Sequence, residues 1–250
     1  MQLRDVLCAA LVLLTGLSTA APAATWFLDA EAAMVQASKN DVRIPGDGGT
    51  DFSLTDDLDT DEDVAFRVRL GWRTSLRSQV TLLYAPLKLH ASGTPAFDID
   101  FNDQLYAAGT DLAGTYQFNS YRATWAYDLA HSENFVFSLG ATVKVRDAFI
   151  ELSDGAVTTR KDDLGIVPLV HLKLDWRWGN VLGLLIEGDA LAVPGAPGRA
   201  EDAQAALVLR PRSRSSLRLG YRIVEGGVDV DEVYNFALIQ SYTFGWSLRF

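Results

Sequence analysis

The chain has 250 residues, of which 48% are hydrophobic and 22% are charged, and its formal net charge is −10. This acidity argues against a nucleic-acid partner, because DNA and RNA are bound by basic surfaces. The one cysteine, Cys8, lies close to the start, so the rest of the sequence has no disulfide and no cysteine-based metal or nucleophilic chemistry.

Residues 1–23 have the composition of a secretory signal peptide. Arg4 provides the positive start, residues 6–17 form an apolar run, and the small residues at 21–23 form a cleavage site. The apolar run is too short for a comfortable membrane-spanning helix, and no later run comes close to its length. We therefore expect a single mature domain, residues 24–250.

The mature chain consists of segments in which large apolar residues alternate with small or polar ones. This period of two predicts β-strands with one apolar and one polar face. In segment 64–73, for example, large apolar residues alternate with a polar set that includes Arg67, Arg69 and Arg73. In chain order the predicted strands are 26–37, 64–73, 79–92, 115–129, 135–152, 164–178, 181–193, 201–210, 217–223 and 235–250.

One predicted strand, 79–92, contains a proline at which the alternation slips. After Pro86 the large apolar residues continue one position late, at Leu87 and Leu89. Proline cannot donate a hydrogen bond to a strand ladder. We therefore expect a β-bulge at Ala85-Pro86, after which Leu87 and Leu89 face outward.

The connections between these strands differ in length. Short turns follow Arg73, Leu129, Trp178 and Arg210. Longer polar loops are expected at 41–63, 93–114, 153–163 and 226–232. The first loop carries an acidic run from Asp56 to Asp63, which lacks the glycine and glutamate of an EF-hand. It is expected to be a solvated outer loop, with loose binding of divalent cations as the alternative.

The final strand presents its large apolar residues, several of them aromatic, on one face up to Phe250. In water such a terminal strand would favour aggregation. The same face is stable if it meets lipid and the strand closes a barrel. The sequence thus predicts an all-β, transmembrane, antiparallel up-and-down barrel of about ten strands, with short turns at one end and long loops at the other.

The tryptophans fall near strand ends on the side of the short turns, in the outward phase. Such aromatic residues favour the lipid–water boundary, because their rings are apolar with one polar edge. The predicted girdle comprises Trp26, Trp72, Trp125, Trp176, Trp178, Trp246 and Phe250.

The opposite face of the strands carries charged side chains, which are expected to line the lumen. The predicted lumen residues are Arg67, Arg69, Arg122, Lys144, Arg146, His171, Lys173, Asp175, Glu187, Asp189, Arg218 and Arg222. In a barrel of this size side chains fill most of the interior. A plug of ion pairs is one interpretation, and a narrow basic pore for small anions is the other.

With its signal, its alternating strands and its aromatic last strand, the chain resembles the Gram-negative outer-membrane β-barrel proteins. The resemblance implies residence in the outer membrane, contact with membrane lipid and lipopolysaccharide, and recognition of the strand ending at Phe250 by the barrel-assembly machinery. We expect a monomer without cofactor or metal. The resemblance covers nearly the whole mature chain but does not specify an activity.

The leading functional prediction is a structural, surface-binding or narrow-pore role, and no catalytic residue is assigned. The alternative is an enzyme that acts on lipid A or on peptides. His90 and Ser92 have the His-x-Ser spacing of barrel-type lipid A deacylases, although the phase of the strand predicts that both face inward. Asp98 and Asp100 resemble half of an omptin-type protease site, but no Asp-x-His sequence accompanies them.

Overall fold

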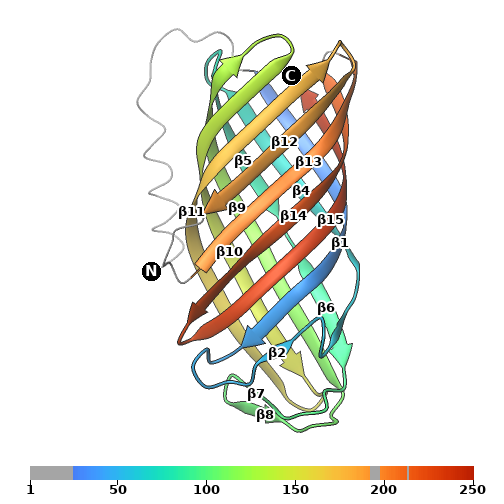
Figure 1. The fold of residues 1–250 in the computed structure, drawn as a ribbon, viewed down its shortest axis with the longest axis vertical. Coiled ribbons are helices and arrows are strands. Elements are labelled where there is room, and N and C mark those ends of the chain that lie inside the picture. Colours follow the sequence, from blue (N-terminus) through green and yellow to red (C-terminus); the bar gives the residue numbers. More distant parts are fainter. Residues whose placement is uncertain (1–24, 192–197, 213) are drawn as a thin grey trace.

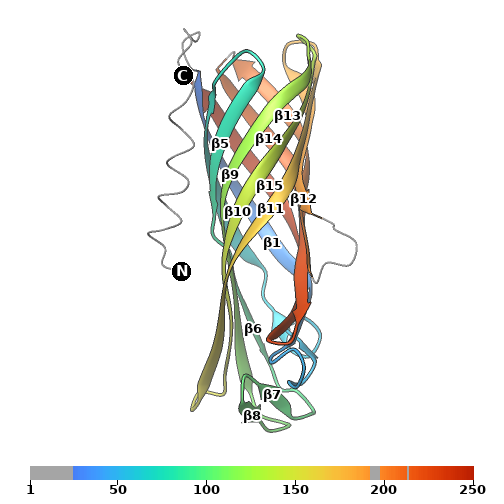
Figure 2. The same ribbon diagram turned by 90° about the vertical axis from the view of Figure 1, so that its left-hand side faces the viewer.

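The computed structural model describes residues 25–191, 198–212 and 214–250, so the predicted signal peptide, 1–23, lies outside the described residues. The regular structure of the described part is β-strand throughout, and it contains no helix long and apolar enough to cross a membrane. The strands tilt around a tall cylinder in Figure 1, and Figure 2 shows the same wall turned by 90°.

Ten wall strands pair antiparallel with their neighbours and close into a barrel. In chain order they are β1 (Trp26–Arg43), β4 (Asp63–Arg73), β5 (Ser78–Ala85) continued by β6 (Lys88–Gly93), β9 (Leu112–His131), β10 (Phe135–Ser153), β11 (Thr158–Trp178), β12 (Leu182–Leu191), β13 (Gly198–Arg212), β14 (Ser215–Val230) and β15 (Val233–Arg249). The barrel closes where β1 pairs with β15, from Phe27↔Arg249 to Arg43↔Tyr234. The predicted fold and strand number are therefore confirmed.

The two ends of the barrel differ. The turn end carries the short connections after β4, β9 and β11, together with Trp26 and Phe250, whose backbone groups exchange hydrogen bonds at 2.9 and 3.0 Å. The loop end carries the two long connections, 44–62 and 94–111. These contain the remaining strands, β2 (Phe52–Ser53), β3 (Asp59–Thr60), β7 (Ile99–Phe101) and β8 (Gln104–Tyr106), at the bottom of Figure 1.

The outward face of the wall is apolar, as the alternation predicts. Phe66 on β4 is 59% exposed and Tyr242 on β15 is 73% exposed, whereas the residues between such positions are largely buried. An apolar surface of this extent around a whole molecule fits a lipid environment.

The interior of the barrel changes character along its length. Toward the turn end it is polar, but toward the loop end it holds an apolar core. Ile44, Phe52 and Leu54 from the first long connection and Phe101 and Tyr106 from the β7–β8 hairpin pack into this core. The loops therefore fold into the mouth of the barrel, where they bury apolar side chains against the wall.

This core corrects the prediction for Leu87 and Leu89. Leu89 is only 1% exposed and belongs to the core, and Leu87 packs against it. The predicted bulge is also wrong: β5 and β6 keep one register with β9, from Ala85↔Ser120 to Lys88↔Gln117. The inward residues of this strand are polar near the turn end and apolar near the loop end. In the sequence, this switch from polar to apolar inward residues looks the same as a shift of the outward face by one residue.

Two predicted loops are mostly strand. In place of a loop at 153–163, β10 and β11 continue to a tight turn at 154–157. The Asp154 carboxylate accepts hydrogen bonds from the N–H groups of Val157 at 2.7 Å and Ala156 at 2.9 Å, which hold its pKa below its usual range. In place of a loop at 226–232, β14 and β15 are joined by two residues.

One side of the wall thins toward the loop end. The partner of β11 on this side, β12, pairs with it only from Val170 to Trp178 and ends at Leu191. Among the described strands, β11 therefore has no partner on this side between Thr158 and Leu169, although β10 continues to pair along its other edge.

Candidate functional site

A network of ion pairs crosses the middle of the barrel, and Asp202 on β13 is at its centre. The Asp202 carboxylate is within 3.1 Å of Arg67, 2.6 Å of Arg122 and 2.5 Å of Arg222. These arginines come from β4, β9 and β14, so the carboxylate joins distant parts of the wall. Asp202 is 3% exposed, and three guanidinium groups balance its charge inside the protein.

Further carboxylates extend this network toward both sides of the lumen. Glu31 lies 3.1 Å from Arg222 and accepts a hydrogen bond from Gln204 at 2.8 Å. Asp189 accepts hydrogen bonds from Arg122 at 2.7 Å and from Thr142 at 2.8 Å.

The sequence-predicted lumen residues are brought together in this network or beside it. Arg69 pairs with Glu187 at 2.8 Å, His171 Nδ1 lies 2.9 Å from Asp189, and Asp175 pairs with Arg210 at 2.6 Å. Arg218 pairs with Asp29, and Arg146 pairs with Asp163. Lys173 lines a cavity toward the turn end, and Lys144 lines one toward the loop end.

The polar lumen residues Asp202, Gln204 and Arg210 of β13 were not predicted from the sequence. They lie on the same face of the strand, together with the apolar residues Ala206 and Val208 between them. The outward residues beside them, Ala203 and Ala205, are small, so the contrast between the two faces is weak. The signal that could have found Asp202 is its phase with Arg210, which places both side chains on one face of the strand.

Two cavities lie on opposite sides of the network. The turn-end cavity measures about 300 Å³ and is lined by basic side chains that include Lys173, Arg177 and Arg249, with Asp29 and Asp128 among its acids. At the level of the network a third space, beside Arg122 and His171, measures only about 20 Å³. That volume corresponds to roughly one water molecule.

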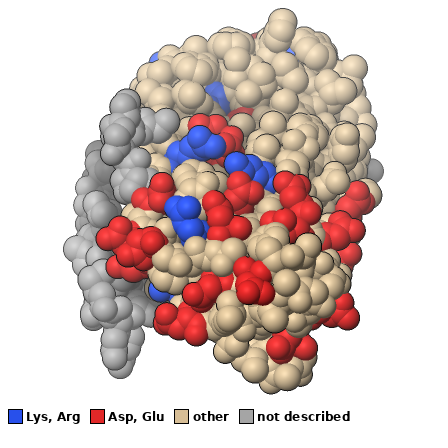
Figure 3. Space-filling view, turned by 60° about the horizontal axis from the view of Figure 1, so that its bottom comes forward, with Lys and Arg blue, Asp and Glu red and all other residues tan. Residues whose placement is uncertain are grey.

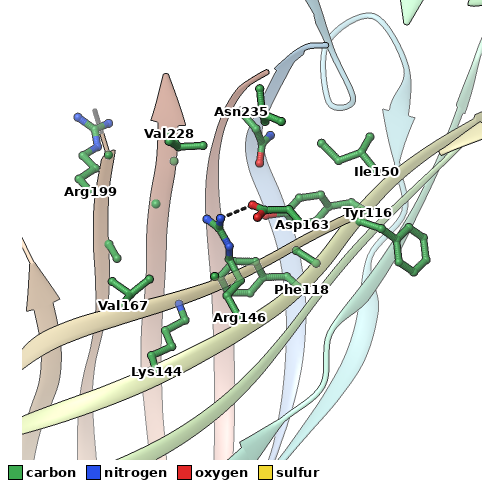
Figure 4. Close-up of a pocket in the computed structure, with 18 of the residues that line it drawn as sticks. Tyr116, Phe118, Lys144, Arg146, Ile150, Asp163, Val167, Arg199, Val228 and Asn235 are labelled. Atoms are coloured by element: carbon green, nitrogen blue, oxygen red, sulfur yellow. Dashed lines mark hydrogen bonds and ion pairs between the residues drawn. The ribbon is translucent and has the colours of Figure 1, made fainter. Parts of the chain in front are cut away.

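The loop-end cavity measures about 270 Å³ and lies where β11 has lost its partner β12 among the described strands. Its walls are mainly apolar and aromatic, with Tyr116 and Phe118 from β9 and Val167 from β11. Figure 4 shows Lys144 reaching into this cavity from β10, with the Arg146–Asp163 ion pair nearby.

The surface around the loop end is acidic at its margin. Figure 3, which brings this end forward, shows Lys and Arg side chains toward the centre with Asp and Glu side chains around them. Much of the acidic run of the first loop is exposed there, and Asp57 accepts a hydrogen bond from the Ser53 N–H at 2.7 Å.

The deacylase-like residues lie on the opposite face from the one predicted. His90 and Ser92 are exposed and face outward, because the strand keeps its phase through Pro86. His90 Nδ1 lies 3.4 Å from the Thr115 hydroxyl. Among the described residues His90 has no carboxylate in hydrogen-bond or ion-pair contact, so the acid that would orient such a histidine is not in place.

The omptin-like residues are not assembled either. Asp98 accepts a hydrogen bond from the Ala108 N–H at 2.8 Å within its own loop, and the Asp100 N–H donates to Thr50. The described Asp–His contacts lie elsewhere: His131–Asp128 is at the turn end, and His171–Asp189 is inside the network.

The predicted girdle residues gather at the turn end. Trp26 and Trp72 face each other in register with ring centres 5.2 Å apart, and Trp72 is half-buried. The rings of Trp125, Trp176, Trp178, Trp246 and Phe250 are exposed. The indole N–H groups of Trp125 and Trp246 donate to Ser78 and Ser215, which satisfies the polar edge of each ring.

No protein family and no curated protein matches this sequence. Among solved structures, the chain is similar to the outer membrane protease OmpT from Escherichia coli, with a TM-score of 0.55 and 9% identity over 94% of this chain and 99% of that one. Ail of Yersinia pestis matches with a TM-score of 0.39 and 11% identity over 90% and 98% of the chains. Neisserial surface protein A matches with a TM-score of 0.35 and 12% identity over 92% of this chain and 100% of that one. The likeness to OmpT shows that the chain has the fold of an outer-membrane β-barrel protein.

Proposed function

We propose that this chain is an integral outer-membrane barrel with a closed lumen, and that its loop end serves as a ligand-binding site. The outward apolar wall would contact membrane lipid and lipopolysaccharide, and β15 would be read by the barrel-assembly machinery. The turn end would face the periplasm, with its tryptophans at the lipid boundary. The fold and the distribution of apolar, aromatic and charged side chains support these assignments.

The observation that carries the proposal is the network centred on Asp202. Its arginines are held by several carboxylates at once, so moving any one of them breaks more than one ion pair. Removing one partner from such a buried network leaves another charge uncompensated, at a cost of roughly 3–5 kcal/mol. Spontaneous opening of a passage through this layer is therefore disfavoured.

The apolar core of the loop end adds a second closed layer. The first long connection and the β7–β8 hairpin bury Ile44, Phe52, Phe101 and Tyr106 in the mouth of the barrel, where the Tyr106 hydroxyl donates to the Leu152 carbonyl at 2.9 Å. The loop-end cavity remains beside this core. A barrel closed in this way supports a surface or binding role better than solute passage.

Conductance across planar bilayers tests the closed lumen. We expect the purified protein to insert without a stable open level, because both layers exclude hydrated ions. The double variant Arg67→Ala/Asp202→Ala removes one ion pair of the network, and thus one charge of each sign. It should raise the conductance, because the network no longer fills the lumen at this level. A stable open level of hundreds of picosiemens for the unmodified protein would contradict the proposal and favour the narrow basic pore.

A further inference from the structure

We propose that the loop-end cavity binds a small amphiphilic monoanion, a carboxylate on an aliphatic or aromatic body, and that Lys144 Nζ provides the counter-charge. This inference deepens the proposed function, since it names the class of ligand for a binding site at the loop end.

Lys144 is a buried cation that stands apart from the ion pairs of the barrel interior. Lys144 is 4% exposed and lines the cavity, yet within the described part of the chain it makes neither an ion pair nor a hydrogen bond. Its ammonium group lies 4.4 Å from the centre of the Phe118 ring. A ring face offsets only part of the cost of desolvating an ammonium group.

The nearby carboxylates are already committed to other cations. Lys144 is paired in register with Arg122 on β9, and Arg122 contacts both Asp189 and Asp202. On its other side, Lys144 is in register with Val167, which is apolar. The ammonium group therefore adjoins the ion-pair network without sharing one of its carboxylates, and an anion in the cavity would complete its surroundings.

The rest of the lining also favours a negative ligand. The cavity is lined by Lys144, Arg146, Lys161 and Arg199, against the acids Asp163 and Glu225. Arg146 pairs with Asp163, and Arg199 pairs with Glu225. Each of the two acids thus pairs with one of the four cations. The cavity lining therefore has a net positive charge, which includes that of the buried Lys144.

The walls and the volume define the body of the ligand. Tyr116, Phe118, Ile150 and Val167 give the cavity an apolar surface, which would exclude a purely polar anion such as phosphate. A cavity of about 150 Å³ accommodates benzene, so one of about 270 Å³ accommodates about ten non-hydrogen atoms by proportion. Octanoate has this size and carries a single charge.

The proposal is tested by comparing the binding of octanoate with that of uncharged octanol. Binding is measured by saturation-transfer NMR on the protein in zwitterionic micelles, and the signal from empty micelles is subtracted. We expect the protein to bind octanoate at least tenfold more tightly than octanol. Lys144→Met, which keeps the length of the side chain and removes its charge, should bind both ligands equally. The control Lys39→Met changes an exposed lysine paired with Asp41 and should keep the preference.

A second variant covers the case in which Lys144→Met does not fold. Val167→Trp fills the cavity without altering charge, and it should abolish binding of both ligands. Octanoate binding no stronger than octanol binding, a preference that survives Lys144→Met, or binding that survives Val167→Trp would each overturn the proposal. If octanoate is not preferred and the protein does not conduct ions, the proposed ligand is wrong while the closed lumen is still supported.

Discussion

At the scale of single residues, Asp202 shows how one carboxylate can organise a polar interior. It is in contact with arginines from three strands, and Glu31 shares two of those arginines, Arg67 and Arg222. Because the groups lie inside the barrel, their attraction is weakly screened and each unpaired charge is costly. The network therefore fixes the relative positions of strands that do not pair directly.

Asp202→Asn should destabilise the protein strongly, because three guanidinium groups would lose their shared negative charge. We expect the free energy of unfolding to fall by roughly 3–5 kcal/mol, measured by denaturant titration with tryptophan fluorescence. The matched change Asp56→Asn, on the acidic outer loop, should alter it by less than about 0.5 kcal/mol. A loss for Asp202→Asn as small as for this control would refute the structural role of the network.

At the scale of the strand, β5 and β6 show that hydrophobic alternation alone does not tell which residues face outward. The character of the lumen at that height of the barrel must also be known. Inward positions are polar at Gln79 and Thr81 but apolar at Leu89. Without the loops that fill the mouth, an inward leucine is indistinguishable in the sequence from a lipid-facing one. The same difficulty placed His90 on the wrong face.

Single cysteines at neighbouring positions of β6 report this phase directly. Residues 24–250 contain no native cysteine, because the one cysteine, Cys8, lies in the predicted signal peptide. Lys88→Cys should react with a small maleimide at least tenfold faster than Leu89→Cys, because Lys88 is exposed and Leu89 is buried in the core. Equal rates, or faster labelling at position 89, would restore the bulge at Ala85-Pro86.

Strand existence was predictable, while strand ends and partners were not. Ten alternating segments are local patterns and could be identified one by one. By contrast, β10, β11 and β14 extend past their apolar stretches because turns such as the one at Asp154 permit tight hairpins. Ion-pair partners such as Arg67 and Asp202 are 135 residues apart, and their contact depends on closure of the barrel.

At the scale of the whole molecule, polarity is distributed in layers along the barrel axis. Tryptophans mark the turn end, charged side chains fill the middle, and apolar loop residues fill the mouth of the loop end. The outward wall is apolar along the strands between the two ends. The described tryptophans gather at one end of this wall, which gives the molecule a direction along the barrel axis.

Depth-dependent quenching checks the position of the tryptophans at the lipid boundary. In vesicles of lipids brominated at different chain positions, we expect tryptophan fluorescence to be quenched most by bromines nearest the headgroup, because the tryptophans cluster at one end of the wall. Trp125→Phe, which removes an exposed indole, should reduce the quenched fraction, while Trp72→Phe should reduce it less. Strongest quenching by bromines at the bilayer centre would contradict this placement.

The seam between β1 and β15 has a consequence for biogenesis. Until residues 233–249 arrive, both β1 and β14 present unsatisfied amide and carbonyl groups that neither lipid nor a partial sheet can accommodate. The polypeptide should therefore stay chaperoned until residues 233–249 can pair with both neighbouring strands. Insertion then becomes an all-or-none event, because no open strand edge can remain in lipid.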